Sequence, residues 1–319
     1  MTMKLLKYSG YLLYTTVVVL FLLWYKFPAE ALKTRIEQDL NSMTPALHWA
    51  VQEISLLPPF DIQLRHISIS GKEDKKPLLT VKTMNLRPDV FTRRKKDNIT
   101  AKYTINLLNG TVTGRLGLAP KRSTLEYDGH IKEVKIDTDR LTFIEQEYRR
   151  TVAGILSGNF SGSRELRRKT HTLQGRFTFA HGAISLQEPV LGMKQLDFDR
   201  IETELNFDTG IIALSRGRIT SPSFAAEFQG DLHTAAPCPL SRIQLSGSFQ
   251  PRPEFTASVD SPRLVHMLKK EMQKGGLPFT VSGLLKEPGI VFTGLPAALN
   301  RMTGLRNKKP QRLPEERSR

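Results

Sequence analysis

The stretch ITAKYTINLLNGTVTGRLGL, from Ile99 to Leu118, decides the fold class. Its apolar and polar residues alternate on both sides of the dipeptide Asn109-Gly110, and this two-residue period is typical of strands that bury one face. Asn-Gly is favoured in two-residue hairpin turns. The pattern therefore predicts an antiparallel hairpin with positive φ at Gly110. The predicted cross-strand pairs are Leu107 with Val112, Ile105 with Gly114, and Tyr103 with Leu116.

Two further stretches repeat this pattern. LQGRFTFAHGAISL (173–186) predicts a hairpin that turns at His181-Gly182, and IETELNFDTGIIAL (201–214) predicts one that turns at Thr209-Gly210. The predicted pairs are Phe179 with Ile184, Phe177 with Leu186, Phe207 with Ile212, and Leu205 with Leu214. Each hairpin places its apolar pairs on one face of a sheet.

Other one-faced strands are expected at 60–70, 77–86, 224–232, 242–250 and 279–292. Five glycines fall on apolar-face positions of the predicted strands: Gly114, Gly175, Gly230, Gly247 and Gly283. Because glycine in a strand allows a bend or the close approach of another backbone, we expect the sheet to curl toward its apolar side.

Three stretches predict helices, at 28–45, 139–156 and 261–276. The first carries an apolar stripe formed by Leu32, Ile36, Leu40 and Met43, and it either packs on the sheet or lies at a membrane surface. Such short helices cannot cover the apolar face of about a dozen strands. The sheet therefore either folds on itself as a sandwich or curls into a groove that another molecule occupies.

The N-terminus indicates a membrane anchor. Eighteen uncharged residues, YSGYLLYTTVVVLFLLWY, lie between Lys7 and Lys26. As a helix they would span about 27 Å, close to the hydrocarbon thickness of a bilayer. Lys4 and Lys7 favour a cytoplasmic N-terminus, which would place the chain from Pro28 onward in the periplasm of a bacterium. A signal peptide cleaved at Ala29–Ala31 is the less favoured alternative.

Composition narrows the class of function. The formal net charge of +16 indicates acidic partners, and the predicted topology favours anionic lipid head groups or acidic proteins over nucleic acid. The single cysteine, Cys238, excludes an intramolecular disulfide. The sequence contains no G-x-S-x-G, no phosphate-binding G-x4-G-K-[ST] and no H-E-x-x-H motif. We therefore expect a non-enzymatic protein with no cofactor and no metal site.

Two sets of residues are candidate binding sites. If the sheet forms a groove, its predicted apolar lining is Tyr103, Ile105, Leu116, Phe177, Phe179, Leu205 and Phe207. The basic runs at 93–96 and 164–169, predicted to be loops, are either solvated surface or contacts to an anionic partner. The predicted contact residues are Arg93, Arg94, Lys95, Lys96, Arg167, Arg168 and Lys169.

Several segments together resemble a known family. They are FPAEALKTRIEQDL (27–40), PLLTVKTMNL (77–86), the G-x-x-x-G pieces GTVTG and GNFSG, and the closing PFTVSGLLKEPGIVF (278–292). From the anchor to Phe292, the chain resembles the type II secretion system protein N family of delta-type proteobacteria. It is more widely similar to AsmA-like envelope proteins, whose strands build a long apolar groove behind one N-terminal anchor.

The narrower resemblance implies a non-enzymatic inner-membrane component of the type II protein secretion system, and this is the favoured function. The wider resemblance implies the alternative, a periplasmic protein that binds or transfers lipid acyl chains. An envelope hydrolase is a third and least favoured class. The expected partners are the inner membrane, secretion components, lipid acyl chains and anionic head groups.

The predicted organisation follows from these features. A cytoplasmic N-terminus (1–7) precedes a single transmembrane helix (8–27) and an amphipathic helix (28–45). A periplasmic domain (46–296) is expected to be mainly β, with a large, curled antiparallel sheet and few helices. A basic tail (297–319) is predicted to be disordered, because Arg301–Arg319 holds seven basic and two acidic residues.

Overall fold

The structure is a computed structural model in which the chain divides into two compact units, unit 1 (Met1–Lys121) and unit 2 (Arg122–Arg319). The described residues are 8, 10, 11, 14, 15, 18, 28–44, 47–58, 61–71, 77–89, 99–119, 121, 123–138, 141, 148, 150–168, 170–235, 238–258, 265, 266, 268, 270, 276–293 and 295. The statements that follow concern these residues.

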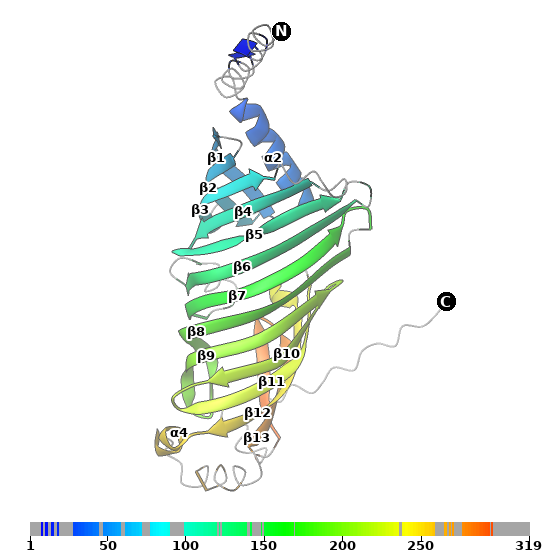
Figure 1. Cartoon of the computed structure of the whole chain (residues 1–319). Coiled ribbons are helices and arrows are strands. Elements are labelled where there is room, and N and C mark those ends of the chain that lie inside the picture. The colour runs from blue at the N-terminus through cyan, green and yellow to red at the C-terminus, as the bar shows by residue number, and fades with distance from the viewer. Residues whose placement is uncertain are drawn as a thin grey trace, which may run out of the picture. The chain divides into compact units, whose positions relative to one another are not determined.

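The described residues form fourteen strands, and in each unit every strand pairs antiparallel with its neighbours in sequence (Figure 1). The strands of unit 1 are β1 (Leu47–Leu57), β2 (Asp61–Gly71), β3 (Pro77–Pro88), β4 (Ile99–Leu107) and β5 (Gly110–Ala119). Those of unit 2 are β6 (Thr124–Asp137), β7 (Val152–Glu165), β8 (Thr170–Val190), β9 (Met193–Asp208), β10 (Ile211–Thr220), β11 (Phe224–His233), β12 (Arg242–Pro251), β13 (Leu277–Leu284) and β14 (Glu287–Phe292). The prediction of a mainly β protein with a large antiparallel sheet is confirmed.

In unit 1 the helix α2 (Ala29–Met43) covers part of the sheet. Leu32 and Ile36 pack against a buried cluster from β1, β2 and β3, which consists of Val51, Ile54, Leu64, Ile67 and Val81. The predicted helix at 28–45 is therefore confirmed, and of its two predicted positions the structure shows packing on the sheet.

Polar side chains of α2 also bind the backbone of β1, the first strand. The Asn41 side chain accepts a hydrogen bond from the Trp49 amide at 2.7 Å and donates one to the Trp49 carbonyl at 3.3 Å. Glu37 accepts a hydrogen bond from the Val51 amide at 2.7 Å. These bonds satisfy backbone groups at an edge that could otherwise pair with another chain.

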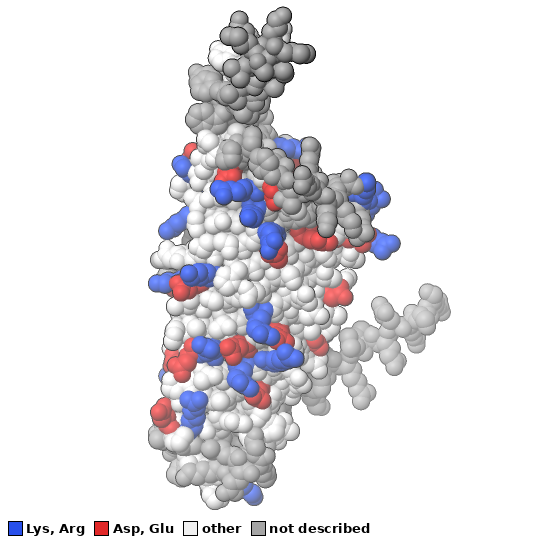
Figure 2. All heavy atoms as spheres, in the orientation of Figure 1, with Lys and Arg blue, Asp and Glu red and all other residues white. Residues whose placement is uncertain are grey.

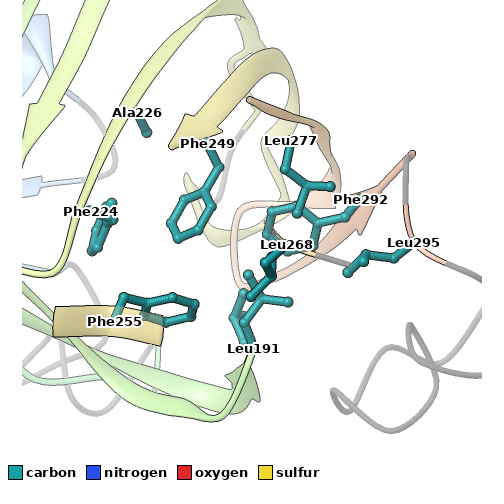
Figure 3. Packing of buried hydrophobic residues seen from close by; sticks show 10 residues of the cluster. Leu191, Phe224, Ala226, Phe249, Phe255, Leu268, Leu277, Phe292 and Leu295 are labelled. Carbon is teal, nitrogen blue, oxygen red and sulfur yellow. The ribbon is translucent and has the colours of Figure 1, made fainter. Parts of the chain in front are cut away.

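The sheet of unit 2 curls until distant strands meet at one end. Leu191, in the turn between β8 and β9, belongs to the same buried cluster as Phe249 of β12 and Phe292 of β14. In a flat sheet β9 and β14 would lie five strand spacings apart, about 24 Å. Figure 3 shows that Phe255, from the six-residue helix α4 (Pro253–Ser258), and Leu268 complete this cluster. We call this end, with its buried core, the closed end.

All nine strands of unit 2 follow one order from β6 to β14, and none of them belongs to a second, facing sheet. The predicted sandwich was a sheet folded on itself, and at the closed end the sheet does pack on itself around Phe249, so the choice between a sandwich and an open groove stays a prediction. Register shifts accompany the curl: the pairings β6–β7, β7–β8, β8–β9, β9–β10 and β10–β11 each shift register once. Bulges at such shifts bend strands and increase their twist.

The hairpin that decides the fold class is present, but its turn lies one residue earlier than predicted. Leu107 pairs with Gly110, Ile105 with Val112 and Tyr103 with Gly114. The positive φ angles fall on Leu108 (47°) and Asn109 (60°), and Gly110 begins β5. The predicted pairs and the predicted φ of Gly110 are therefore wrong. The predicted faces are correct, because each residue's partner shifts by two positions and a shift of two preserves the alternation.

The second predicted hairpin is wrong. Residues 173–186 lie within the single strand β8, which continues through His181 and Gly182 as a bulge with a φ of 49° at His181. Phe179 pairs with Leu156 of β7 and Ile201 of β9, and not with Ile184. A histidine with positive φ before a glycine occurs in bulges as well as in turns. The dipeptide His181-Gly182 alone therefore did not distinguish a bulge from a hairpin turn.

The third hairpin is confirmed. Phe207 pairs with Ile212 and Leu205 with Leu214 across a turn in which Thr209 and Gly210 have φ angles of 42° and 92°.

The helices predicted in unit 2 are only partly observed. Within 139–156, the stretch expected to hold a short helix, Tyr148 is helical, Val152–Leu156 begin β7, and 139, 140, 142–147 and 149 lie outside the described residues. Residues 265, 266, 268 and 270 are helical, and the rest of 261–275 lies outside the described residues. So does most of the predicted anchor at 8–27, together with the whole tail at 297–319. Among the described residues, no helix has the length and apolar character needed to cross a membrane.

Candidate functional site

The candidate site is the apolar face of the unit 2 sheet. Its residues come from β7 to β14 and are partly buried, unlike the fully buried cluster at the closed end, against which Ile290 packs. They are Leu156, Phe160, Leu173, Phe177, Phe179, Leu205, Phe207, Leu214, Phe228, Leu232, Leu245, Val281 and Ile290. We call this set the apolar face.

The pairing registers show that the apolar face is continuous. One row of directly opposed residues crosses all nine strands of unit 2 without a polar side chain. This row is Gly129, Phe160, Gly175, Leu205, Leu214, Gly230, Leu245, Val281 and Ile290. The apolar face is therefore continuous from β6 to β14 and only partly buried.

Aromatic residues on this face oppose glycines on neighbouring strands. The pairs are Tyr127 with Gly162, Phe160 with Gly129 and Gly175, Phe177 with Gly158, Phe198 with Gly182, Phe228 with Gly217 and Gly247, and Phe279 with Gly247. Unit 1 contains the same arrangement, in which Tyr103 lies opposite Gly114. An aromatic ring that lies across a glycine covers backbone which would otherwise be bare.

The rings lie against the adjacent strand and do not project straight from the sheet. A methyl group on Gly217 would lie 2.5–2.6 Å from three ring carbons of Phe228, and one on Gly247 would lie 2.7 Å from the ring of Phe279. Each ring therefore occupies the place of the missing side chain. The result is an apolar surface of low relief.

A polar group formed by Tyr127, His171 and Arg164 lies at the end of the apolar face opposite the closed end. The Tyr127 ring crosses Gly162 of β7, so its hydroxyl reaches β8, where it bonds His171 Nε2 and lies 3.3 Å from the Thr172 carbonyl oxygen. The His171 ring lies 5.2 Å from that of Phe207, measured between centroids. Arg164 is the direct cross-strand partner of His171.

Burial sets the protonation of this group. Loss of solvent lowers the pKa of His171, and the positive charge of Arg164 lowers it further. Burial also raises the pKa of Tyr127. At neutral pH the histidine and the tyrosine are therefore neutral, and Arg164 supplies the positive charge.

The opposite face of these strands is polar and charged. Glu204 of β9 binds Arg176 of β8 at 2.5 Å and Arg216 of β10 at 3.0 Å, and Arg218 of β10 binds Glu227 of β11 at 3.2 Å. The hydrogen bond from Arg176 holds the pKa of Glu204 below its usual value. Figure 2 likewise shows side chains of both signs interspersed on the surface it presents. The sheet is thus two-sided, with mutually compensated charge on one face and apolar side chains on the other.

The predicted site residues are distributed over both units. Phe177, Phe179, Leu205 and Phe207 lie together on the apolar face of unit 2. Tyr103, Ile105 and Leu116 lie on the apolar face of unit 1, where Tyr103 is buried. All five predicted apolar-face glycines lie opposite apolar or aromatic residues.

Two of the seven residues predicted to contact an anionic partner lie among the described residues. Arg167 and Arg168 are exposed in the turn after β7, and Arg168 pairs with Glu165 at 3.6 Å. Arg93, Arg94, Lys95, Lys96 and Lys169 lie outside the described residues. The prediction that the run at 164–169 is a loop is wrong for Arg164 and Glu165, which end β7, and Arg164 was not among the individually predicted contact residues.

The described part of the chain holds no group of three or more histidine, cysteine or acidic side chains placed to bind a metal ion, and Cys238 is exposed. Comparisons with protein families, with curated proteins and with solved structures find no match to this chain.

Proposed function

We propose that this protein is a non-enzymatic, membrane-anchored protein that binds the acyl chains of lipid on the apolar face of unit 2. The observation that carries the proposal is the row of nine apolar positions that crosses β6 to β14 and remains half-buried. Burying such side chains contributes about 25 cal/mol for each Å² removed from water, which gives the face a strong affinity for hydrocarbon.

The low relief of the face favours an extended apolar ligand. The rings of Phe228 and Phe279 lie across Gly217 and Gly247, so at these positions they cover the neighbouring strand and do not project straight from the sheet. An acyl chain needs contact along its length and no specific hydrogen bonds, which a smooth apolar surface supplies. The geometry thus favours the lipid-binding alternative over a purely structural secretion component.

The location is part of the same proposal. The apolar run at 8–25 and the basic residues before it favour an inner-membrane anchor with a cytoplasmic N-terminus and a periplasmic β region. An alkaline phosphatase reporter fused after Gly294 should then be active, and the protein should resist a carbonate wash. Release of a shortened, soluble protein would instead indicate cleavage near Ala29–Ala31.

A photocrosslinking amino acid at position 179 tests lipid binding in cells. Phe179 lies on the apolar face, whereas Gln174 lies on the same strand, is exposed and faces the other way. We expect lipid adducts from position 179 and none from position 174, identified by mass spectrometry. Protein adducts at 179 without lipid would refute the proposal, because they would show that another chain covers the face.

Association with the type II secretion system remains a second proposal, and it rests on the sequence resemblance. The exposed turn that holds Arg167 and Arg168 is a suitable position for a crosslinker directed at protein partners. Adducts to secretion components from this turn would support the association whether or not position 179 binds lipid.

A further inference from the structure

The polar group at the end of the apolar face opposite the closed end has a specific construction. Tyr127 belongs to β6, yet its hydroxyl contacts residues of β8, two strands away. It can do so only because Gly162 lies between them, since a methyl group at that position would come within 2.6 Å of the tyrosine ring. Three adjacent strands thus bring a phenol, an imidazole and a guanidinium together on the apolar side of the sheet.

Arg164 is the unusual member. It lies between Leu125 and His171 in register, on the side of β7 that carries Phe160. It is half-buried, and among the described residues no carboxylate lies within ion-pair distance of it. The adjacent Glu165 points to the opposite face and pairs with Arg168. Arg164 is partly buried as a residue beside an apolar surface, and among the described residues its charge lacks an acidic partner, so a bound anion would stabilise it.

The chemistry of the three side chains suits an oxyanion. A guanidinium binds phosphate through two parallel hydrogen bonds, and an imidazole N–H can donate another. The single O–H of Tyr127 is directed at His171 and Thr172, so the phenol positions the imidazole. The Phe207 ring packs on the other side of His171 and joins the polar group to the apolar face without a gap. An anion bound here would therefore lie at the end of a hydrocarbon-binding surface.

We propose that Arg164 and His171, the latter positioned by Tyr127, bind the phosphate head group of a lipid, whose acyl chain then runs along β7, β8 and β9 toward the closed end. This inference rests on the proposed function and gives the ligand an orientation. Eight residues separate His171 from Phe179, about 26 Å along a strand. One leaflet of a bilayer is about 15 Å of hydrocarbon, half the full thickness. The surface is therefore long enough for one acyl chain.

The test compares two single-chain lipids on the purified full-length protein, by native mass spectrometry after release from a non-ionic detergent. Lysophosphatidic acid carries the phosphate, and a monoacylglycerol of the same chain length does not. We expect lysophosphatidic acid to bind about tenfold more tightly, the effect of one hydrogen-bonded charge. Arg164→Gln should abolish that preference and leave monoacylglycerol binding unchanged.

Arg167→Gln is the matched control, because it removes the same charge from the exposed turn nearby. It should retain the preference, and an equal loss in both variants would overturn the site in favour of diffuse attraction. Limited proteolysis of each variant verifies that it folds, and Arg164→Lys provides a second variant that retains the charge but not the bidentate geometry. Its preference should lie between those of the wild type and Arg164→Gln.

The remaining outcomes separate the head-group site from the proposed function. If both lipids bind equally to the wild type and to Arg164→Gln, the site is overturned while lipid binding stands. If neither lipid binds, both proposals fail. Inorganic phosphate is the third probe: if it binds as tightly as lysophosphatidic acid and is lost in Arg164→Gln, the site is one for free phosphate and the lipid orientation is wrong.

Discussion

Replacing Gly217 by alanine tests directly whether the space in front of the apolar face is open. The added methyl group would lie 2.5–2.6 Å from the ring of Phe228, and the three heavy atoms nearest to it all belong to that ring. The ring must therefore lift off β10, while the backbone can stay in place. Where the ring moves depends on what stands in front of the sheet.

The magnitude follows from the contact that is lost. A covered phenylalanine buries about 150–250 Å², and lifting one edge of the ring would expose roughly 40 Å², or about 1 kcal/mol. Gly217 has no left-handed φ, so alanine also stabilises by about 0.4–1 kcal/mol through the unfolded chain. With open space in front, the free energy of unfolding should change by less than about 0.5 kcal/mol. In a packed interior the displaced ring would cost about 1–3 kcal/mol.

The assay is limited proteolysis of the full-length protein in lipid nanodiscs at rising temperature, with fragments of unit 2 identified by mass spectrometry. A change of 1 kcal/mol shifts the melting temperature by about 2–4 °C for a unit of this size. Gly247→Ala is the destabilised control, because its methyl group would lie 2.1 Å from the Glu227 carbonyl oxygen, which is backbone. We expect Gly217→Ala to melt near the wild type and to bind lipid more weakly. A large loss of stability in both variants, with unchanged lipid binding, would refute the open face.

Three further predictions concern single side chains. Leu108→Gly should stabilise unit 1 by about 1 kcal/mol, because Leu108 has a φ of 47°, whereas Gly110→Ala should be nearly neutral. Thermal unfolding followed by Trp49 fluorescence measures both changes, and a destabilised Leu108→Gly variant would contradict the assigned turn. Asn41→Ala should cost about 1–3 kcal/mol in the same assay, since it leaves the amide and carbonyl of Trp49 without their partner, and a neutral result would mean that water replaces it. Burial lowers the pKa of His171, so the unfolded chain binds the proton more readily than the folded chain. Unit 2 should therefore be most stable above about pH 6.5 and lose stability as the pH falls below that value. If the stability of the wild type and of His171→Gln depended on pH in the same way, this prediction would be wrong.

The faces of the strands could be predicted from sequence more securely than their partners. Alternation fixes which side of a strand is apolar, and Tyr103 and Phe207 both lie on the predicted side. Alternation does not distinguish a turn from a bulge, so His181-Gly182 was assigned to a hairpin although it lies within β8. The difference is tertiary: Gly182 lies under the ring of Phe198, which comes sixteen residues later.

The candidate site, too, could be predicted from sequence only in part, because it depends on strand pairing. Glycines on the apolar face were visible in the sequence, but their aromatic partners lie on other strands and depend on register. Arg164 follows the alternating segment that begins at Val152, and its position in a basic run concealed the fact that the strand continues to it. No local pattern could bring it beside His171 and Tyr127, because that arrangement requires the pairing of three strands.

The order of the strands has a consequence for how such a protein could change its size. Because every strand of a unit pairs with its immediate neighbours in sequence, a gained or lost pair of consecutive strands would alter the width of the sheet by about 10 Å and leave the remaining pairings intact. Repeat proteins grow in this modular way, with each module stabilised mainly by its neighbours. The buried cluster around Phe249 and Phe255 would limit such growth at the closed end, because strands from both sides of the curl must still meet there. Duplication of hairpins is therefore best tolerated among the strands that contribute least to that cluster.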